Sequence, residues 1–239
     1  MVLLDSSNSL IDILDLNIKI YLLNIKNKLN LKFFEKISSI CANYHIIHIH
    51  MRYNLRYLKL ISILTNFTWE KVFFHDHYGN IKNDKSIDFF TKYIIRNTKY
   101  IGVSRELCDW AEAYCNCQQT FLLENIIIKD KIDFKKKKNN LGFHLVLVSN
   151  IHPRKNIEFA IKVMRELNKK GVYYLDIIGQ KINKKYFYDI CNLIRKHKLE
   201  NFIKIDHSCS NIQKIIHNYD LGLHTSKSET GPLVLIEYL

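Results

Sequence analysis

The sequence contains little proline and glycine, with 2 Pro and 7 Gly among 239 residues. Residues that break regular structure are therefore rare, and 47% of the chain is hydrophobic. This composition excludes an intrinsically disordered protein. The chain also lacks an apolar run of the roughly 18 residues that a membrane-spanning helix needs. Its start, MVLLDSSNSLIDILDL, has no basic segment and contains Asp within the apolar part, so no secretory signal is expected.

Cysteines are few and poorly spaced for metal binding. There are 6, and only Cys115 and Cys117 lie close together, as C-x-C. Zinc sites usually show pairs of the form C-x₂₋₄-C with a second matching pair. We interpret the cysteines as reduced, buried thiols of a cytoplasmic protein.

Acidic residues are the minority charge. The chain has 23 Asp and Glu against 36 Lys and Arg, which gives a formal net charge of +13. Such an excess favours an anionic partner, which is nucleic acid, anionic lipid or a phosphorylated substrate. The charge alone does not choose among these three.

Strand and helix patterns alternate along most of the chain. Runs of β-branched and aromatic residues predict strands at 18–23, 45–50, 71–75, 100–103, 120–123, 141–149, 172–178, 202–205 and 221–225. Helical spacing predicts helices at 31–41, 54–64, 86–97, 105–114, 156–169, 185–196 and 210–218, and from 232 onward. Ser104 is expected to cap the helix at 105–114, and 210–213 reads as a capping box. This repetition predicts parallel sheets covered by helices on both faces.

A polar stretch divides the chain. Residues 129–140, KDKIDFKKKKNN, contain four consecutive lysines, which is typical of a solvated linker. We therefore predict an α/β domain at 1–133, a basic linker at 134–140 and a second α/β domain at 141–239. In such doubly wound domains, ligands bind at the carboxyl ends of the strands.

The chain ends on a Gly-Pro pair followed by an apolar run. We interpret Gly231 as a turn and Pro232 as the start of a helix, because the fixed backbone angle of proline suits a first helical turn. The free N–H groups of Leu233 and Val234 would then form a small anion site.

Two carboxylates flank this turn. Glu237 lies about 7–8 Å along the predicted helix, where its carboxylate would bind a ribose diol. Glu229, before the turn, would face whatever is attached beyond a bound diphosphate. The spacing therefore predicts a nucleotide-sugar site, whereas the alternative interpretation is two ordinary surface carboxylates.

Three segments of the chain occur in the same order as in a known protein family. They are VSNIHPRKNIEFAI, LDIIGQ and NYDLGLHTSKSETGPLVLIEYL, and the last carries an E-x₇-E motif. Residues 141–239 thereby resemble the donor-binding domain of family-4 glycosyltransferases, the retaining group with the GT-B fold. Residues 45–126 resemble the acceptor-side domain less specifically, through FFHDHYG, IGVSREL and LLENIII.

The resemblance implies a fold and a reaction. The fold would be α/β, with two doubly wound, Rossmann-like domains facing a cleft. The reaction would transfer a hexose, with retention of configuration, from a nucleotide diphosphate sugar to a saccharide or lipid-linked acceptor in cell-surface polysaccharide synthesis. No cofactor or metal would take part. Compared with the family, both ends are expected to be truncated, lacking the first strand with its Gly-rich loop and the continuation of the last helix.

Roles for individual residues follow from the same resemblance. Lys155 matches the lysine that binds the donor diphosphate, whereas Asn150 stands where the family usually has an arginine. Arg154 is the candidate to compensate. Taken alone, Arg154 and Lys155 are better interpreted as a solvated basic turn, and the flanking match reverses this preference. Glu229 would contact the sugar hydroxyls and Glu237 the ribose.

Two further positions belong to this predicted donor site. Thr230 would supply backbone around the sugar, next to the Gly-Pro turn. Gly179 ends a predicted strand, where the absence of a side chain would let the backbone approach the nucleotide.

On the acceptor side, His75 ends the strand KVFFH and is similar to the active-site histidine of the family. It would donate a hydrogen bond to the sugar or to the forming bond. His48 and His50 form one HxH pair, and His75 and His77 form another. A catalytic zinc ion needs a third ligand, and the sequence nominates none, so no metal is expected.

Basic and aromatic residues interleave at 26–36, 52–59 and 92–100. We interpret these patches as contacts with an anionic membrane surface rather than with nucleic acid, and solvated helix faces are the alternative. A cytoplasmic protein, peripheral at the inner face of the membrane, is therefore expected. Two other functions stay open: a non-catalytic fragment that binds nucleotide sugar, and a basic nucleic-acid-binding protein.

Overall fold

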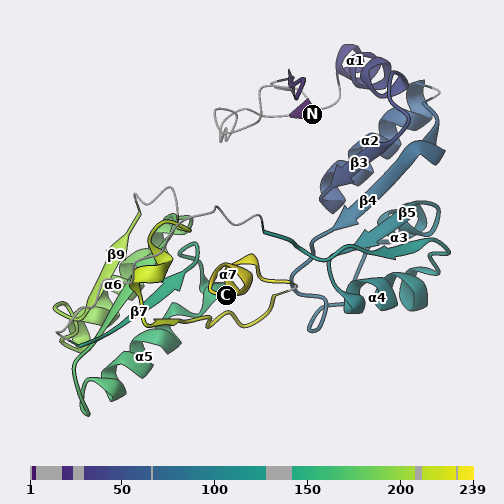
Figure 1. Ribbon diagram of the computed structural model, residues 1–239. Coiled ribbons are helices and arrows are strands. Elements are labelled where there is room, and N and C mark those ends of the chain that lie inside the picture. The colour runs from purple at the N-terminus through teal and green to yellow at the C-terminus, as the bar shows by residue number, and fades with distance from the viewer. Residues whose placement is uncertain are drawn as a thin grey trace. The chain divides into compact units, whose positions relative to one another are not determined.

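Two units, each built from alternating strands and helices, make up the computed structural model (Figure 1). Unit 1 comprises Met1–Tyr78 and Ser86–Leu123, and unit 2 comprises Gly79–Lys85 and Glu124–Leu239. The structure describes residues 2–3, 18–23, 30–65, 67–127, 142–207, 212–229 and 231–239. The predicted linker at 134–140 lies outside these residues, and the predicted domain boundary stays a prediction.

Unit 1 contains a parallel sheet of four strands in the order β3-β4-β5-β6. The strands are β3 (Ile47–His50), β4 (Val72–Asp76), β5 (Lys99–Gly102) and β6 (Thr120–Leu122). The helices are α1 (Leu31–Ala42), α2 (Arg52–Thr65), α3 (Phe89–Arg96) and α4 (Arg105–Cys115), with a 3-10 turn at Trp69–Lys71. Two short parallel strands, β1 (Val2–Leu3) and β2 (Tyr21–Leu22), pair separately.

Unit 2 contains a second parallel sheet, in the order β10-β7-β8-β9. The strands are β7 (Phe143–Val148), β8 (Tyr173–Ile178), β9 (Ile203–Asp206) and β10 (Leu221–Gly222). The helices are α5 (Ile157–Leu167), α6 (Lys184–Lys196) and α7 (Leu233–Glu237), with 3-10 turns at Pro153–Lys155 and Ile216–Asn218. The chain builds outward from β7 to β9 and then returns to the other side of β7, so the strand order reverses between β7 and β10.

Apolar faces of the helices hold each sheet in place. In unit 2, Ile157, Ile161 and Met164 of α5 are fully buried in one cluster with Leu175 and Ile177 of β8. Burying each such side chain contributes about 1.5–3 kcal/mol. The 3.6-residue period of 156–169 is therefore what fixes α5 against the sheet.

Side-chain caps define where several helices begin. Asp88 accepts a hydrogen bond from the Thr91 N–H at 2.9 Å, and Asn183 accepts one from the Tyr186 N–H at 2.9 Å. Such caps satisfy amide groups that have no partner within the helix. Ser104 occupies the corresponding position before α4, but it makes no side-chain cap. The predicted N-cap position is therefore confirmed, without a capping hydrogen bond from the Ser104 side chain.

Most predicted elements are confirmed, and several are shorter than predicted. Of the strand expected at 18–23, only β2 (Tyr21–Leu22) forms. The helix expected from 86 begins at Phe89, because Asp88 caps it. The strand expected at 221–225 ends at Gly222, since the following residues leave the sheet. The helix expected at 210–218 is reduced, over the described residues 212–218, to turns and the 3-10 segment Ile216–Asn218. Its predicted capping box falls partly on residues 208–211, which lie outside the described ranges.

The thiols agree with the prediction. The five cysteines in the described ranges are free, and four of them, Cys41, Cys108, Cys115 and Cys117, are buried. No helix among the described residues is both long enough and apolar enough to cross a membrane.

Candidate functional site

The carboxyl ends of β7 and β10 lie side by side at the point where the strand order of unit 2 reverses. The two strands pair in parallel, with Leu221 opposite Leu145 and Gly222 opposite Val146. In open α/β sheets, a crevice forms outside the strand ends at such a reversal, because the following connections run to opposite faces. The segments 149–155 and 223–229 leave the sheet here.

These two segments are joined to each other by hydrogen bonds. Thr225 Oγ1 donates to the carbonyl of Lys155 at 2.8 Å, and the Lys227 N–H donates to the carbonyl of Arg154 at 3.0 Å. Lys155 Nζ lies 2.5 Å from Glu229 Oε1. Lys155 and Glu229 were predicted to bind the diphosphate and the sugar of a donor. In the structure their side chains lie together, where the strand order of unit 2 reverses.

The Lys155–Glu229 pair is partly shielded from water, with side chains 29% and 24% exposed. Burial acts to raise the pKa of Glu229, but hydrogen bonds from Lys155 and Ser226 and the charge of Lys155 outweigh it, so this pKa lies below its ordinary value. Burial, with Lys155 nearby, lowers the pKa of His224 despite the opposing charge of Glu229. At neutral pH Glu229 is thus a carboxylate and His224 a neutral imidazole.

His224 and Ser226 are residues that the sequence interpretation missed. Both belong to HTSKSE, the segment that connects β10 to Glu229. Their proximity in sequence to Glu229 was the only available signal, because neither residue type has a motif of its own here.

The last helix is anchored at the same strand ends. Tyr238 directly follows α7, and its hydroxyl accepts a hydrogen bond from the Val148 N–H at 3.0 Å and donates to the Leu223 carbonyl at 3.1 Å. The Tyr238 ring packs on Gly222, where an added Cβ would come within 2.5 Å of it. Tertiary contacts therefore compensate for the shortness of α7, because a helix of five residues has little stability alone.

The Gly-Pro turn before α7 is also fixed by a side chain. Gly231 has φ of 60°, a left-handed conformation that favours glycine, and its carbonyl accepts a hydrogen bond from Asn125 Nδ2 at 2.6 Å. Pro232 precedes α7 instead of forming its first residue, so the predicted start is displaced by one position. Leu233 and Val234 form the first turn, as predicted. Thr230 lies outside the described residues.

Gly179 and Asn150 meet where β7 and β8 end. Gly179 has φ of 155°, and an added Cβ would lie 2.2 Å from the carbonyl oxygen of Ser149. The backbone of the protein itself thus requires glycine here, and approach to a nucleotide stays a prediction. The side chain of Asn150 accepts a hydrogen bond from the Gln180 N–H at 3.3 Å, so it ties the two strand ends together where the related family has an arginine.

The remaining predicted residues of unit 2 differ in exposure. Arg154 is exposed, next to the half-buried Lys155. Glu237 is the last residue of α7 and is half-buried, and burial raises the pKa of its carboxyl group. Since Tyr238 is fastened to the sheet, the position of Glu237 is fixed as well.

In unit 1, His75 lies near the carboxyl end of β4 and is buried, 6% exposed. Neither of its ring nitrogens makes a hydrogen bond of normal geometry among the described residues. Burial, reinforced by the neighbouring imidazoles of His77, His50 and His48, lowers the pKa of His75 to about 4, against a weak opposing effect of the Leu123 backbone. His75 is therefore neutral at physiological pH.

Asp76, the next residue, serves a different purpose. It accepts hydrogen bonds from Arg52 Nη2 at 2.7 Å, from Tyr100 Oη at 2.9 Å and from the Tyr78 N–H at 3.1 Å. With its side chain 2% exposed, this carboxylate joins β4 to β5 and to the start of α2.

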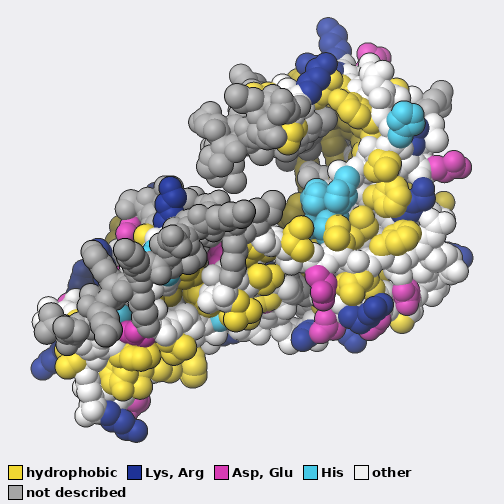
Figure 2. Space-filling model, viewed as in Figure 1, with side chains coloured by type: hydrophobic (Ala, Val, Ile, Leu, Met, Phe, Trp, Pro, Cys, Tyr) yellow, Lys and Arg dark blue, Asp and Glu magenta, His cyan; other side chains and the backbone are white. Residues whose placement is uncertain are grey.

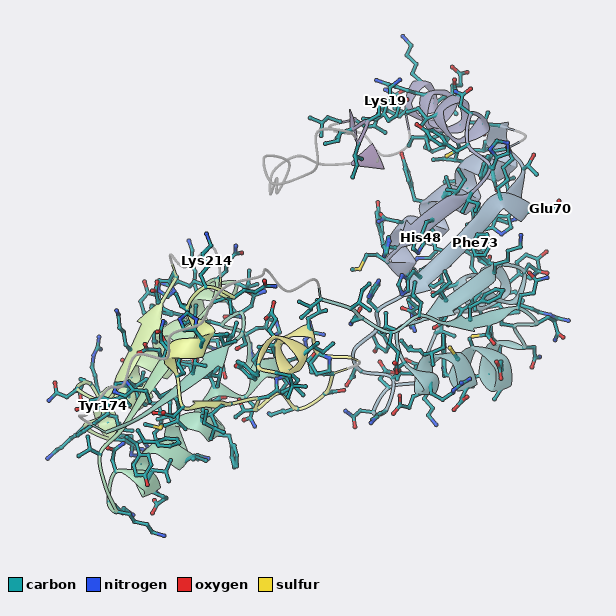
Figure 3. All side chains as sticks on the ribbon, in the orientation of Figure 1. Lys19, His48, Glu70, Phe73, Tyr174 and Lys214 are labelled. Carbon is teal, nitrogen blue, oxygen red and sulfur yellow. The ribbon has the colours of Figure 1, made fainter. Side chains whose placement is uncertain are left out.

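The two HxH pairs of unit 1 come together and supply the third histidine that the sequence did not nominate. Strands β3 and β4 pair in register with His50 opposite His75. The rings of His48 and His75 stack at 5.2 Å, and those of His75 and His77 lie 4.3 Å apart. Figure 2 shows histidine side chains gathered on the surface, and Figure 3 labels His48 on β3 beside Phe73 on β4.

Residues 128–239 match the family model for glycosyl transferases group 1. This segment contains the whole Lys155–Glu229 site and α7. Among curated proteins, none matches the chain.

Three solved structures resemble this chain, and two of them are a glycosyltransferase and a galactosyltransferase. Anabaena Alr3699/HepE in complex with UDP and glucose has a TM-score of 0.68 at 16% identity, covering 92% of this chain and 64% of that one. A glycosyltransferase from Rickettsia africae ESF-5 has a TM-score of 0.68 at 17% identity, covering 87% and 60%. The apo lipopolysaccharide outer core galactosyltransferase WaaB has a TM-score of 0.63 at 14% identity, covering 92% and 63%.

These similarities establish the fold. The predicted α/β fold with parallel sheets, of the GT-B type, is confirmed. The chain spans less than two thirds of the length of each of these structures.

Proposed function

We propose that this chain acts as a retaining glycosyltransferase of family 4, which transfers a hexose from a nucleotide diphosphate sugar to a saccharide or lipid-linked acceptor. One observation carries the proposal: Lys155 and Glu229 form an ion pair at the strand-order reversal of unit 2, inside the segment that matches glycosyl transferases group 1. Related folds solved with UDP, glucose and UDP-glucose favour a uridine diphosphate sugar as donor.

In the proposed reaction, the bond between the sugar C1 and the diphosphate oxygen breaks, and its electron pair leaves with the diphosphate. The acceptor hydroxyl oxygen bonds to C1 on the same face, and its proton passes to the departing phosphate oxygen. Lys155 Nζ stabilises the negative charge that grows on the departing diphosphate. Such stabilisation by preorganised donors is usually the largest single contribution to catalysis. Glu229 holds the sugar hydroxyls, and His75 donates a hydrogen bond to the sugar.

The ion pair explains how Lys155 stays in position before the donor binds. Its partial burial makes an unpaired ammonium group unfavourable, and Glu229 compensates this charge. We infer that the donor inserts its diphosphate beside Lys155 and its sugar beside Glu229. Because α7 has only five residues, the N–H groups of Leu233 and Val234 add less to this anion site than Lys155 does.

The other positions take supporting roles in the proposal. Glu237 binds the ribose diol from α7, and Gly179 borders the nucleotide. Arg154 and Asn150 lie beside the diphosphate, and Gly231 and Pro232, with Thr230, line the sugar. No metal or cofactor is needed, because Lys155 and backbone N–H groups neutralise the diphosphate.

We further propose a role in cell-surface polysaccharide synthesis, with the protein cytoplasmic and peripheral at the inner face of the membrane. The supporting observation is α3, where Phe89 and Tyr93 are 85% and 55% exposed beside Lys92 and Arg96. Exposed aromatic and basic side chains on one helix suit an anionic lipid surface.

The test measures turnover of UDP-, GDP- and ADP-sugars by the purified chain and by Lys155→Met and Glu229→Gln. We expect each variant to lose at least about 100-fold in turnover, with nucleotide affinity reduced for Lys155→Met and retained for Glu229→Gln. Lys162→Met is the matched control, because Lys162 is exposed on α5. Unchanged turnover in both site variants would refute the proposal, and binding without turnover by the wild type would support a non-catalytic nucleotide-sugar protein instead.

A further inference from the structure

Four histidines of unit 1 lie close together, three of them on two adjacent strands and the fourth directly after the second strand. Side chains alternate along a strand, so His48 and His50 of β3 point to one face. The register places His75 of β4 directly opposite His50, and His77 follows two positions after His75. This arrangement brings together two sequence motifs that are separated by more than twenty residues.

The geometry is that of a three-nitrogen ligand set. One ring nitrogen from each of His48, His50 and His75 lies within 4.8 Å of the others. Ligand nitrogens about 2.0–2.1 Å from a tetrahedral ion are separated by roughly 3.4 Å. His48 and His50 are exposed, and the terminal side-chain torsion of histidine adopts a broad range of angles. Small ring rotations can therefore shorten the nitrogen–nitrogen distances to this separation.

His75 supplies an independent observation. This side chain is buried, and neither ring nitrogen makes a hydrogen bond of normal geometry within the described part of the chain, although the Leu123 backbone lies close enough to act on its pKa. A buried polar group without a partner costs about 1–3 kcal/mol. Since its ring stacks on His48 and lies against His77, a ligand bound among the imidazoles would satisfy His75.

His77 and Asp76 lie next to the three histidines and have different roles. His50 Nδ1 lies 3.0 Å from His77 Nε2, and when Nδ1 donates this hydrogen bond, His50 Nε2 keeps the lone pair that a metal requires. Outer hydrogen bonds of this kind orient metal-binding histidines. Asp76 is not a ligand, because Arg52 and Tyr100 occupy its carboxylate.

We propose that His48, His50 and His75 bind a divalent transition-metal ion of the zinc class, with His77 as the outer partner of His50. Neutral imidazole suits Zn²⁺, Cu²⁺ and Ni²⁺ rather than Mg²⁺ or Ca²⁺. Three histidines leave a fourth position for water. A bound ion would also occupy His75, so it would inhibit sugar transfer; this consequence alone rests on the proposed function.

The binding test uses Zn²⁺ in competition with a chromophoric chelator, and Co²⁺ absorption as a readout of coordination. The full chain is expected to bind Zn²⁺ at equal stoichiometry and to give Co²⁺ the intense visible bands of a four-coordinate ion. The double variant H48Q/H50Q removes two exposed ligands, and we expect its affinity to fall more than about 100-fold. His77→Gln is expected to weaken binding about 10-fold.

His45→Gln is the matched control, because His45 is exposed just before β3 and outside the cluster. It is expected to bind Zn²⁺ like the wild type. Circular dichroism checks that each variant is folded, and H48Q/H50Q serves even if His75→Gln does not fold. Equal Zn²⁺ affinity in the wild type and H48Q/H50Q, or no four-coordinate Co²⁺ spectrum in the wild type, would overturn the proposal.

Transfer assays with added Zn²⁺ separate the two proposals. Inhibition of the wild type, relieved in H48Q/H50Q, supports both of them. If Zn²⁺ binds and no sugar turnover occurs at any Zn²⁺ concentration, the metal site stands and the proposed transferase fails. If sugar turnover occurs and Zn²⁺ does not bind, the proposed transferase stands and the metal site fails.

Discussion

Each unit carries an ion pair at the carboxyl end of its parallel sheet, and the two pairs differ in their surroundings. In unit 1, Arg52 and Asp76 lie 2.7 Å apart with side chains 18% and 2% exposed. In unit 2, Lys155 and Glu229 lie 2.5 Å apart with side chains 29% and 24% exposed. The first pair is enclosed by protein, and the second is open enough to exchange its partner.

The partners of the two pairs explain this difference. Arg52 stacks on the rings of Tyr78 and Trp110, with its guanidinium carbon 4.2 and 4.6 Å from their centroids, and Asp76 receives the Tyr100 hydroxyl. The Lys155–Glu229 pair instead links two loop segments where the strand order reverses. We infer that the Arg52–Asp76 pair stabilises unit 1, whereas the pair in unit 2 is kept for a ligand.

The largest effect is therefore expected from Asp76→Ala. This change leaves the guanidinium of Arg52 without its carboxylate, and breaking a buried pair costs about 3–5 kcal/mol. Both tryptophans, Trp69 and Trp110, belong to unit 1, so their fluorescence during urea unfolding reports on this unit.

The control for Asp76→Ala is Arg56→Ala. Arg56 forms an exposed pair with Asp88, with side chains 45% and 51% exposed, and such pairs contribute about 0–1 kcal/mol. If Asp76→Ala costs no more than this control, the distinction between an enclosed and an open pair is wrong.

A smaller effect is expected from Tyr238→Phe in unit 2. The change removes a hydroxyl that serves the Val148 N–H and the Leu223 carbonyl, and leaving such groups unsatisfied costs about 1–3 kcal/mol. Because Tyr238 holds α7, nucleotide affinity should fall as well. Thermal unfolding followed by circular dichroism and nucleotide titration measure the two effects. Tyr188→Phe is the control, since Tyr188 is 61% exposed on α6, and identical behaviour of the two variants would contradict the anchoring role.

The sequence predicts the elements of both units well, because strands and helices are written in local periodicity. Residues 156–169 repeat at helical spacing, and α5 forms there. Lys155 and Glu229 were assigned to neighbouring ligand groups, and the structure joins them directly. Residues 223–225 were predicted as strand but lie outside β10. Thr225 and Lys227 instead donate hydrogen bonds to Lys155 and Arg154, and local periodicity does not encode contacts so distant in sequence.

Cross-strand register is what the sequence could not supply. Each HxH pair was recognised on its own strand, but only the pairing of β3 with β4 places His50 opposite His75. Asn125 and Tyr238 were missed for the same reason, because they act on Gly231, Val148 and Leu223 from far along the chain.

The smallest expected effect concerns the pH dependence of unit 2. The pKa of Glu229 lies below its ordinary value in the folded chain, so between these two pKa values the unfolded chain binds more protons. Glu229 thus stabilises the fold above the ordinary pKa of glutamate, and this contribution is lost as pH falls through the lowered value. In Lys155→Met the lysine no longer opposes the effect of burial, so the pKa of Glu229 rises. The free energy of unfolding should therefore increase less steeply with pH than in the wild type.

Measuring urea stability of both proteins from about pH 3 to pH 6 tests this linkage. Lys162→Met removes the same charge from an exposed site on α5, so it corrects for the change in net charge. A slope that is flattened equally in Lys155→Met and Lys162→Met would mean that only net charge matters. A slope flattened in Lys155→Met alone identifies Lys155 as the group that keeps Glu229 ionised. That result would separate the open pair of unit 2 from the enclosed pair of unit 1, because only the open pair would link acid stability to a residue of the proposed donor site.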